Sequence, residues 1–74
     1  GTVGVESLVS GNLWKWKVQE GDLVESGQCL AIIESMKMEI SLDCPDDGSV
    51  HSLLKPEGGH VSPGENLLLI ETRP

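Results

Sequence analysis

The two halves of this chain repeat one another. A shift of 37 residues lays 3–34 onto 40–71 without a gap, and eight of the 32 aligned pairs are identical. Turn glycines and core aliphatic residues are set by backbone geometry and packing, so their recurrence predicts two equivalent units related by a quasi-twofold axis. The identical pairs are Gly11/Gly48, Glu20/Glu57, Gly21/Gly58, Val24/Val61, Gly27/Gly64, Leu30/Leu67, Ile33/Ile70 and Glu34/Glu71.

Each unit is expected to consist of short β-strands. Nine glycines and four prolines interrupt the 74 residues too often for a helix, and apolar residues recur at every second position or in short runs. We predict four strands in each half, two interlocked antiparallel sheets, and residues 1–74 as one all-β domain. Gly21 is expected to take a positive φ in a turn. The expected strand segments are 3–9, 13–18, 23–24, 29–33, 40–42, 50–54, 61 and 67–70.

The two tryptophans lie in one of these segments. In 13–18, Trp14, Trp16 and Val18 alternate with lysines, which predicts a half-buried strand with Leu13 out of phase. Both tryptophans are expected to pack in the core and on the sheet surface rather than to form a ligand platform.

The joint between the two copies holds a conspicuous lysine. Residues 35–39 remain between the repeats, and Lys37 stands there between Met36 and Met38. With a strand expected on either side, Lys37 should lie at the tip of a hairpin, and both chain ends should lie at the opposite end of the molecule. An amine held out in this way invites modification by another protein. The alternative interpretation is a solubilising charge beside two core-filling methionines.

Composition excludes several classes of partner. Twelve Asp and Glu against five Lys and Arg give a net charge of −7, which leaves no basic surface for nucleic acid. No apolar run approaches a bilayer-spanning length and the N-terminus lacks signal-peptide features, so we expect a cytoplasmic protein that does not enter a membrane. The chain begins with Gly1 rather than Met, which indicates a processed product or a piece of a longer protein.

No pattern indicates a catalytic or metal site within the chain. Cys29 and Cys44 lack a second ligand cluster, so free thiols are expected. His51 and His60 are single, lie in different halves, and are expected at the surface or in turns. No Ser/His/Asp set, Cys/His pair or phosphate-binding loop is found, and no catalytic residue is predicted.

The residues around Lys37 match a known family. Glu-Ser-Met-Lys-Met-Glu-Ile (34–40) is preceded by Gly-Asn-Leu-Trp-Lys (11–15) and Glu-Gly-Asp-Leu-Val-Glu-Ser-Gly-Gln (20–28), and is followed by Pro-Asp-Asp-Gly-Ser-Val (45–50). Over nearly its whole length the chain resembles the biotinyl (biotin carboxyl carrier) domains of biotin-dependent carboxylases. The resemblance implies a flattened β-barrel of two four-stranded sheets, the barrel-sandwich hybrid, with biotin attached to Lys37.

Within the family, the Gly-Asn-Leu-Trp-Lys stretch looks most like urea carboxylase (urea amidolyase) carriers and small single-domain biotin/lipoyl attachment proteins. Many relatives have Ala or Val where Ser35 stands, and many have a proline shortly before the position of Gly11. The missing proline argues against a pyruvate- or propionyl-type enzyme. The gapless halves leave no room for the thumb-like insertion of some bacterial acetyl-type carriers.

The resemblance implies a carrier rather than an enzyme. A biotin protein ligase would biotinylate Lys37, which would then carry CO2 as carboxybiotin from a biotin carboxylase site to a carboxyltransferase site. Met36 and Met38 would offer apolar contact to the ligase, or would cap the core. Glu34 and Glu39 bracket the tip as recognition residues or as solvated strand ends.

Two alternatives of other classes stay open. A lipoyl carrier of a 2-oxoacid dehydrogenase complex resembles this pattern, but it usually has an acidic residue before its lysine and a small one after it. A structural barrel-sandwich module that carries nothing would have no reason to place a lysine at the joint of the duplication.

Overall fold

The computed structural model describes residues 1–72, and this part of the chain contains eight β-strands and no helix. Five of the seven connections between strands contain glycine or proline, and Gly21 has a φ of 93° as predicted. The strands are β1 (Thr2–Glu6), β2 (Gly11–Trp16), β3 (Leu23–Val24), β4 (Cys29–Ser35), β5 (Met38–Asp43), β6 (Gly48–Leu53), β7 (His60–Val61) and β8 (Asn66–Thr72).

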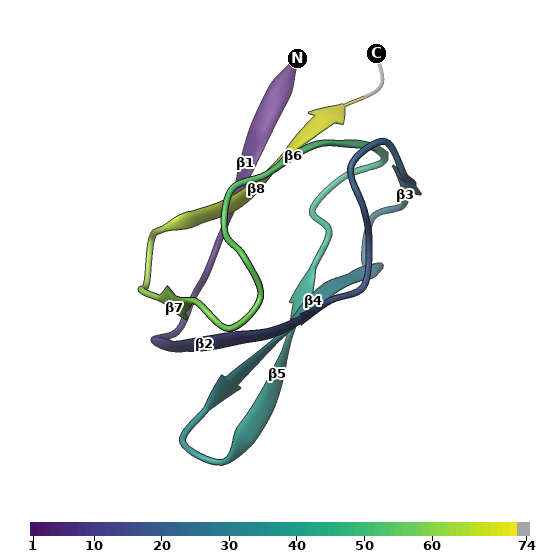
Figure 1. Cartoon of the computed structure of the whole chain (residues 1–74). Coiled ribbons are helices and arrows are strands. Elements are labelled where there is room, and N and C mark those ends of the chain that lie inside the picture. Colours follow the sequence, from purple (N-terminus) through teal and green to yellow (C-terminus); the bar gives the residue numbers. More distant parts are fainter. Residues whose placement is uncertain (73–74) are drawn as a thin grey trace.

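The strands form two antiparallel four-stranded sheets with the orders β1-β8-β6-β3 and β5-β4-β2-β7. A shift of 37 residues relates β1 to β5, β2 to β6, β3 to β7 and β4 to β8, and this substitution converts the first order into the second. Each sheet therefore contains strands from both halves (Figure 1). The prediction of a flattened barrel of two interlocked, quasi-twofold-related sheets is confirmed.

The core lies between the sheets and is built from equivalent positions of the two repeats. Burial of these aliphatic side chains is the main favourable term in folding, at roughly 25 cal/mol per Å² of apolar surface. The repeat identities Val24/Val61, Leu30/Leu67 and Ile33/Ile70 are at most 1% exposed, so the predicted core is confirmed. Its other members are Val5, Leu13, Val18, Ala31, Leu42, Cys44, Val50 and Leu68.

The first strand is shorter than predicted. It ends at Glu6, because the buried Ser7 hydroxyl donates a hydrogen bond of 2.6 Å to the carbonyl oxygen of Val9 and turns the chain. Cys44 has the same role in the second half, where its thiol donates to the carbonyl of Asp46. Leu8 is therefore not a strand residue, and its side chain is 87% exposed.

The predicted phase of the tryptophan strand is wrong. The pairing of β2 with β4 shifts between Leu13 and Lys15, which is a β-bulge, and the extra residue leaves Leu13 fully buried. Trp14 faces outward and is 53% exposed, so it does not pack in the core. Trp16 does pack against the core, and its indole Nε1 donates to the carbonyl of Lys55.

The start of β1 and the end of β8 lie at the end of the molecule opposite the β4–β5 hairpin, as predicted for the chain ends, although residues 73–74 themselves lie outside the described part of the chain (Figure 1). The long axis measures 38 Å, and at the terminal end the amide of Thr72 donates to the carbonyl of Gly1 at 2.8 Å. Among residues 1–72, none belongs to a helix long and apolar enough to cross a membrane.

Candidate functional site

The predicted hairpin is present, and its turn consists of Met36 and Lys37 alone. Strand pairing between β4 and β5 continues to Ser35↔Met38, which leaves these two residues to reverse the chain. Their φ angles are 48° and 68°, both in the left-handed region. Positive φ at both central positions is typical of a type I′ turn, whose twist suits a hairpin and which usually contains Asn-Gly.

Left-handed backbone at two non-glycine residues makes this turn strained, because the Cβ of each L-residue crowds the following carbonyl at roughly 1–2 kcal/mol per residue. Asparagine tolerates this conformation better than methionine does. We therefore expect Met36→Asn to raise the free energy of unfolding by about 1 kcal/mol, measured by urea denaturation with tryptophan fluorescence.

The matched control for this turn prediction is Met38→Asn. Met38 pairs with Ser35 inside β5 and is absent from the residues with positive φ, so asparagine there brings only its poor strand propensity. A gain in stability from both substitutions, or from neither, would contradict strain at the turn.

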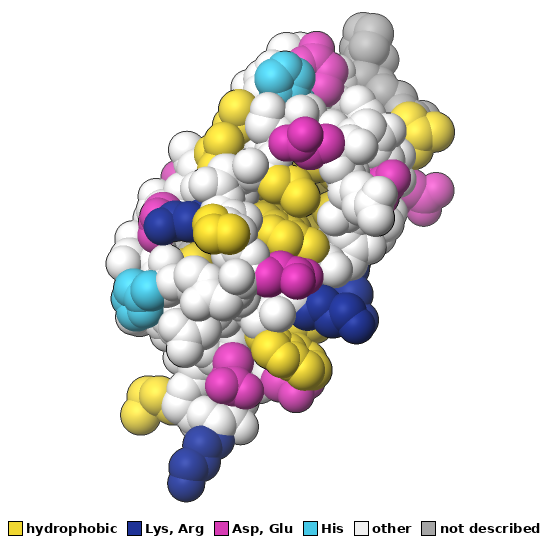
Figure 2. Space-filling model, in the orientation of Figure 1, with side chains coloured by type: hydrophobic (Ala, Val, Ile, Leu, Met, Phe, Trp, Pro, Cys, Tyr) yellow, Lys and Arg dark blue, Asp and Glu magenta, His cyan; other side chains and the backbone are white. Residues whose placement is uncertain are grey.

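The side chains at the tip extend into solvent. Lys37 is exposed, and Figure 2 shows a basic side chain projecting from the end of the molecule that this hairpin forms. Met36 is 92% exposed and Met38 63% exposed. The suggestion that the methionines cap the core is therefore wrong, and both remain available for contact with another molecule.

Two carboxylates face each other in the residue pair adjacent to the one that closes the turn. Glu34 and Glu39 are directly opposed in the β4–β5 pairing, and both are exposed. Like charges directly opposite on two strands are destabilising. Within residues 1–72 the ion pair that the structure contains, Lys55–Glu65, lies elsewhere and involves neither of them. The hairpin therefore presents the Lys37 amine at its tip and two carboxylates, Glu34 and Glu39, on the strands next to the turn.

Three residues that the sequence did not assign to the site fix the hairpin to the body. The Ser35 hydroxyl at the end of β4 donates to the carbonyl of Ser10 at 2.7 Å. A Cβ at Gly11 would overlap the carbonyl oxygen of Glu34, so only glycine lets β2 cross so close to the hairpin base. The Gly11/Gly48 identity pointed to Gly11, whereas Ser10 and Ser35 had no sequence signal.

The remaining candidate residues lie away from this tip. His51 and His60 are exposed, as predicted. Cys29 and Cys44 are free thiols that donate to backbone carbonyls. Within the described range 1–72, no three His, Cys, Asp or Glu side chains gather as metal ligands would. The chemistry available at the tip is thus that of one exposed primary amine on a rigid support.

Comparison with known proteins identifies relatives over nearly the whole chain. A family model described as "Biotin-requiring enzyme" matches residues 2–70. The chain is 46% identical over 67 residues to the biotin/lipoyl attachment protein of Bacillus subtilis, covering 90% of this chain and 89% of that protein.

Two further relatives match this chain through a segment of a larger protein. The crystal structure of Kluyveromyces lactis urea carboxylase superposes with a TM-score of 0.90 and 31% identity, over 96% of this chain and 6% of that one. A dihydrolipoyllysine-residue acetyltransferase component of the pyruvate dehydrogenase complex from Acholeplasma laidlawii is 34% identical over 65 residues, which are 88% of this chain and 12% of the relative. The chain thus spans only a small part of both proteins.

Proposed function

Because the chain belongs to the biotin-requiring enzyme family of biotin/lipoyl attachment domains, we propose that it is a biotin carboxyl carrier with biotin attached to Lys37. Residues 1–74 would act as one carrier domain, with halves 3–34 and 40–71 joined by the hairpin 35–39. The observation that carries the proposal is the position of Lys37, which is exposed in a two-residue turn at the joint of the duplication.

The tip fits a covalently attached group of this kind. The Lys37 amine would form an amide with the carboxyl carbon of biotinyl-adenylate, losing a proton while AMP leaves. The product is neutral where an ammonium stood, so the domain becomes one unit more negative. Biotin supplies a ureido nitrogen that can carry a carboxyl group, and the chain itself supplies a projecting arm on a rigid body.

The tip residues would recognise the enzyme that attaches biotin. Met36 and Met38 are exposed and adaptable in shape, which suits apolar contact with a biotin protein ligase. The opposed carboxylates of Glu34 and Glu39 would pair with basic groups on that ligase, because such contact relieves their mutual repulsion.

The other partners would be the two catalytic centres that the arm visits. By analogy with the urea carboxylase that it resembles, the carrier would move between a biotin carboxylase and a carboxyltransferase and would contribute no catalytic residue. The free thiols of Cys29 and Cys44 suit a reducing compartment, which favours the cytoplasm.

A lipoyl carrier is the second candidate, favoured by the likeness to the acetyltransferase component of a pyruvate dehydrogenase complex. Biotin is the better proposal because methionines flank Lys37 on both sides, whereas lipoyl domains usually have an acidic residue before the lysine and a small one after it.

Intact mass measures the proposed modification directly. Incubation with biotin, ATP and a biotin protein ligase should add the mass of biotin less one water to the protein, and Lys37→Ala should gain nothing. A parallel incubation with lipoate, ATP and a lipoate ligase separates the candidates. Addition of lipoate alone would make the protein a lipoyl carrier, and no gain from either ligase would leave a structural module.

A further inference from the structure

A groove runs along the side of the body between the edge strands β1 and β5. We call it the seam groove. It has a volume of about 400 Å³. Within residues 1–72, β1 pairs only with β8 and β5 only with β4, so the facing edges of these two strands have no strand partner. Eleven residues line the groove: Gly4, Val5, Glu6, Leu8, Val9, Ile33, Ile40, Ser41, Leu42, Asp43 and Pro45.

The seam groove lies on the quasi-twofold axis. Its lining contains both members of four repeat-related pairs, which are Gly4/Ser41, Val5/Leu42, Glu6/Asp43 and Leu8/Pro45. One cavity can contain both members of such pairs only where the two halves meet at their axis. The groove is thus the place where the flattened barrel is left open between its two sheets.

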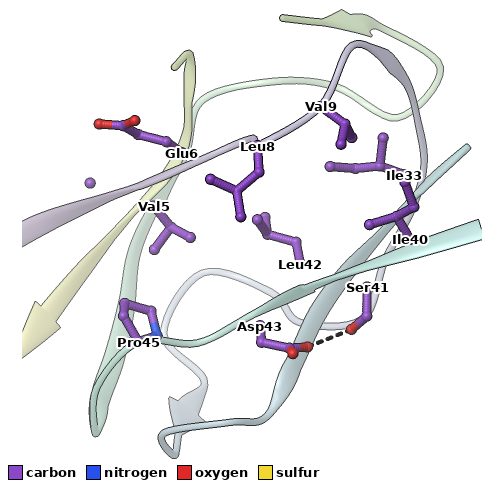
Figure 3. Close-up of a pocket in the computed structure, with 11 residues that line it drawn as sticks. Val5, Glu6, Leu8, Val9, Ile33, Ile40, Ser41, Leu42, Asp43 and Pro45 are labelled. Atoms are coloured by element: carbon purple, nitrogen blue, oxygen red, sulfur yellow. Dashed lines mark hydrogen bonds between the residues drawn. The ribbon is translucent and has the colours of Figure 1, made fainter. Parts of the chain in front are cut away.

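The floor of the seam groove is apolar and one of its side chains is uncovered. Leu8 points across the groove toward Leu42, with Val5 and Pro45 beside them (Figure 3). Leu8 is 87% exposed, although its side chain faces other apolar groups. Removing an exposed leucine side chain from water is favourable in free energy, because apolar surface is transferred out of solvent. A molecule that covered Leu8 would gain part of this free energy.

The rim of the seam groove is acidic. Glu6 and Asp43 are exposed and point away from the apolar floor, each on its own strand (Figure 3). Along β5 the outward positions are Glu39, Ser41 and Asp43, whereas Leu42 between them is buried. None of the eleven lining residues is basic. Along the free edge of β5, aliphatic side chains that point into the groove therefore alternate with polar side chains that point outward, and two of these polar side chains are anionic.

We propose that the seam groove binds an extended segment of a partner protein that pairs with the free edge of β5 and alternates aliphatic residues with Lys or Arg. In a paired strand, inward side chains would cover Leu8 and Leu42 while outward side chains would meet Glu39 and Asp43. A second copy of this chain fits poorly, because its net charge of −7 would add repulsion at the acidic rim. The proposal does not depend on modification of Lys37.

A short peptide with this alternation tests the proposal. The ¹⁵N-labelled protein would be titrated with acetyl-Lys-Leu-Lys-Val-Lys-Leu-Lys-amide and, separately, with the same peptide containing Glu in place of Lys. We expect saturable amide shifts confined to 4–9 and 38–45 with the basic peptide and none with the acidic one. Leu8→Ser should weaken binding roughly tenfold, since it removes most of one leucine's buried surface.

Leu23→Ser is the matched control, because Leu23 is also an exposed leucine, at 71%, but does not line the groove. It should bind the peptide as the unaltered protein does. Shifts spread over all acidic surfaces, or binding unaffected by Leu8→Ser, would reduce the interaction to charge attraction and overturn the proposal. Shifts at the same amides on raising the protein concentration alone would make a second copy the occupant, and no shift at all would also overturn it.

Discussion

Replacing Gly48 by alanine is expected to lower the free energy of unfolding by about 3 kcal/mol or more, out of a total on the order of 5 kcal/mol for a domain of this size. A Cβ at Gly48 would overlap the carbonyl oxygen of Glu71, and the Ile70 side chain lies 3.1 Å from the same point. Both neighbours belong to β8, which pairs with β1 and β6 and cannot retreat. Urea denaturation followed by tryptophan fluorescence would measure the loss.

Gly4→Ala is the control that distinguishes a clash with rigid backbone, expected at Gly48, from the general effect of replacing a glycine in a strand. A Cβ at Gly4 would also come too close to its neighbour, at 2.7 Å, but that neighbour is the movable end of the Asn66 side chain. We expect a change within about 1 kcal/mol, since alanine also loses less chain entropy on folding. Equal losses for Gly4→Ala and Gly48→Ala would show that rigid backbone contact is not the cause.

The identity Gly11/Gly48 shows why the sequence repeat predicted the fold so well. Gly11 approaches the carbonyl of Glu34 as Gly48 approaches that of Glu71, so the same crossing occurs in both sheets. Glu20 and Glu57 recur for a related reason, since each accepts a hydrogen bond from a backbone amide of the other half, at Leu53 and Trp16. A contact that occurs in both halves thus requires the same residue type at both repeat positions, whether it lies within one half, as at Gly11 and Gly48, or between the halves, as at Glu20 and Glu57.

Two features were missed although both recur in the second half, where the pairing of β6 with β8 shifts between Val50 and Ser52 and Cys44 takes the place of Ser7. The bulge between Leu13 and Lys15 adds one residue to one strand, and alternation carried through it placed Trp14 inside. The corner at Ser7 depends on a hydrogen bond from its side chain to a carbonyl two residues away, which apolar periodicity does not reveal. Both errors came from assuming that one period continues along a segment.

The candidate site was also predicted only in part. The hairpin and the exposure of Lys37 followed from the leftover residues between the copies, because topology alone places the joint at one end. The anchoring of the hairpin by Ser35 to Ser10, and the direct opposition of Glu34 and Glu39, depend on strand register. Register is fixed by the two-residue turn, whereas the repeat identified the joint only as residues 35–39.

Exchanging the two turn residues, with Met36→Lys and Lys37→Met together, is expected to slow biotinylation by roughly 100-fold, because misplacing a reacting group by about an ångström can cost that much. The exchange keeps the composition, the net charge and a non-glycine residue at both left-handed positions. Only the position and direction of the amine change. Initial rates of mass gain with a biotin protein ligase would measure the effect.

Met36→Leu is the control for the exchange, since it alters the same turn position and leaves the amine in place. Its rate should stay within about tenfold of the unaltered protein, because an exposed leucine still offers apolar contact. Circular dichroism and thermal unfolding of all three proteins would establish that the exchanged variant is folded. Modification of the displaced lysine at the rate of the unaltered protein would mean that the ligase needs only an exposed amine at the tip, and that the geometry of the turn at Lys37 has no part in recognition.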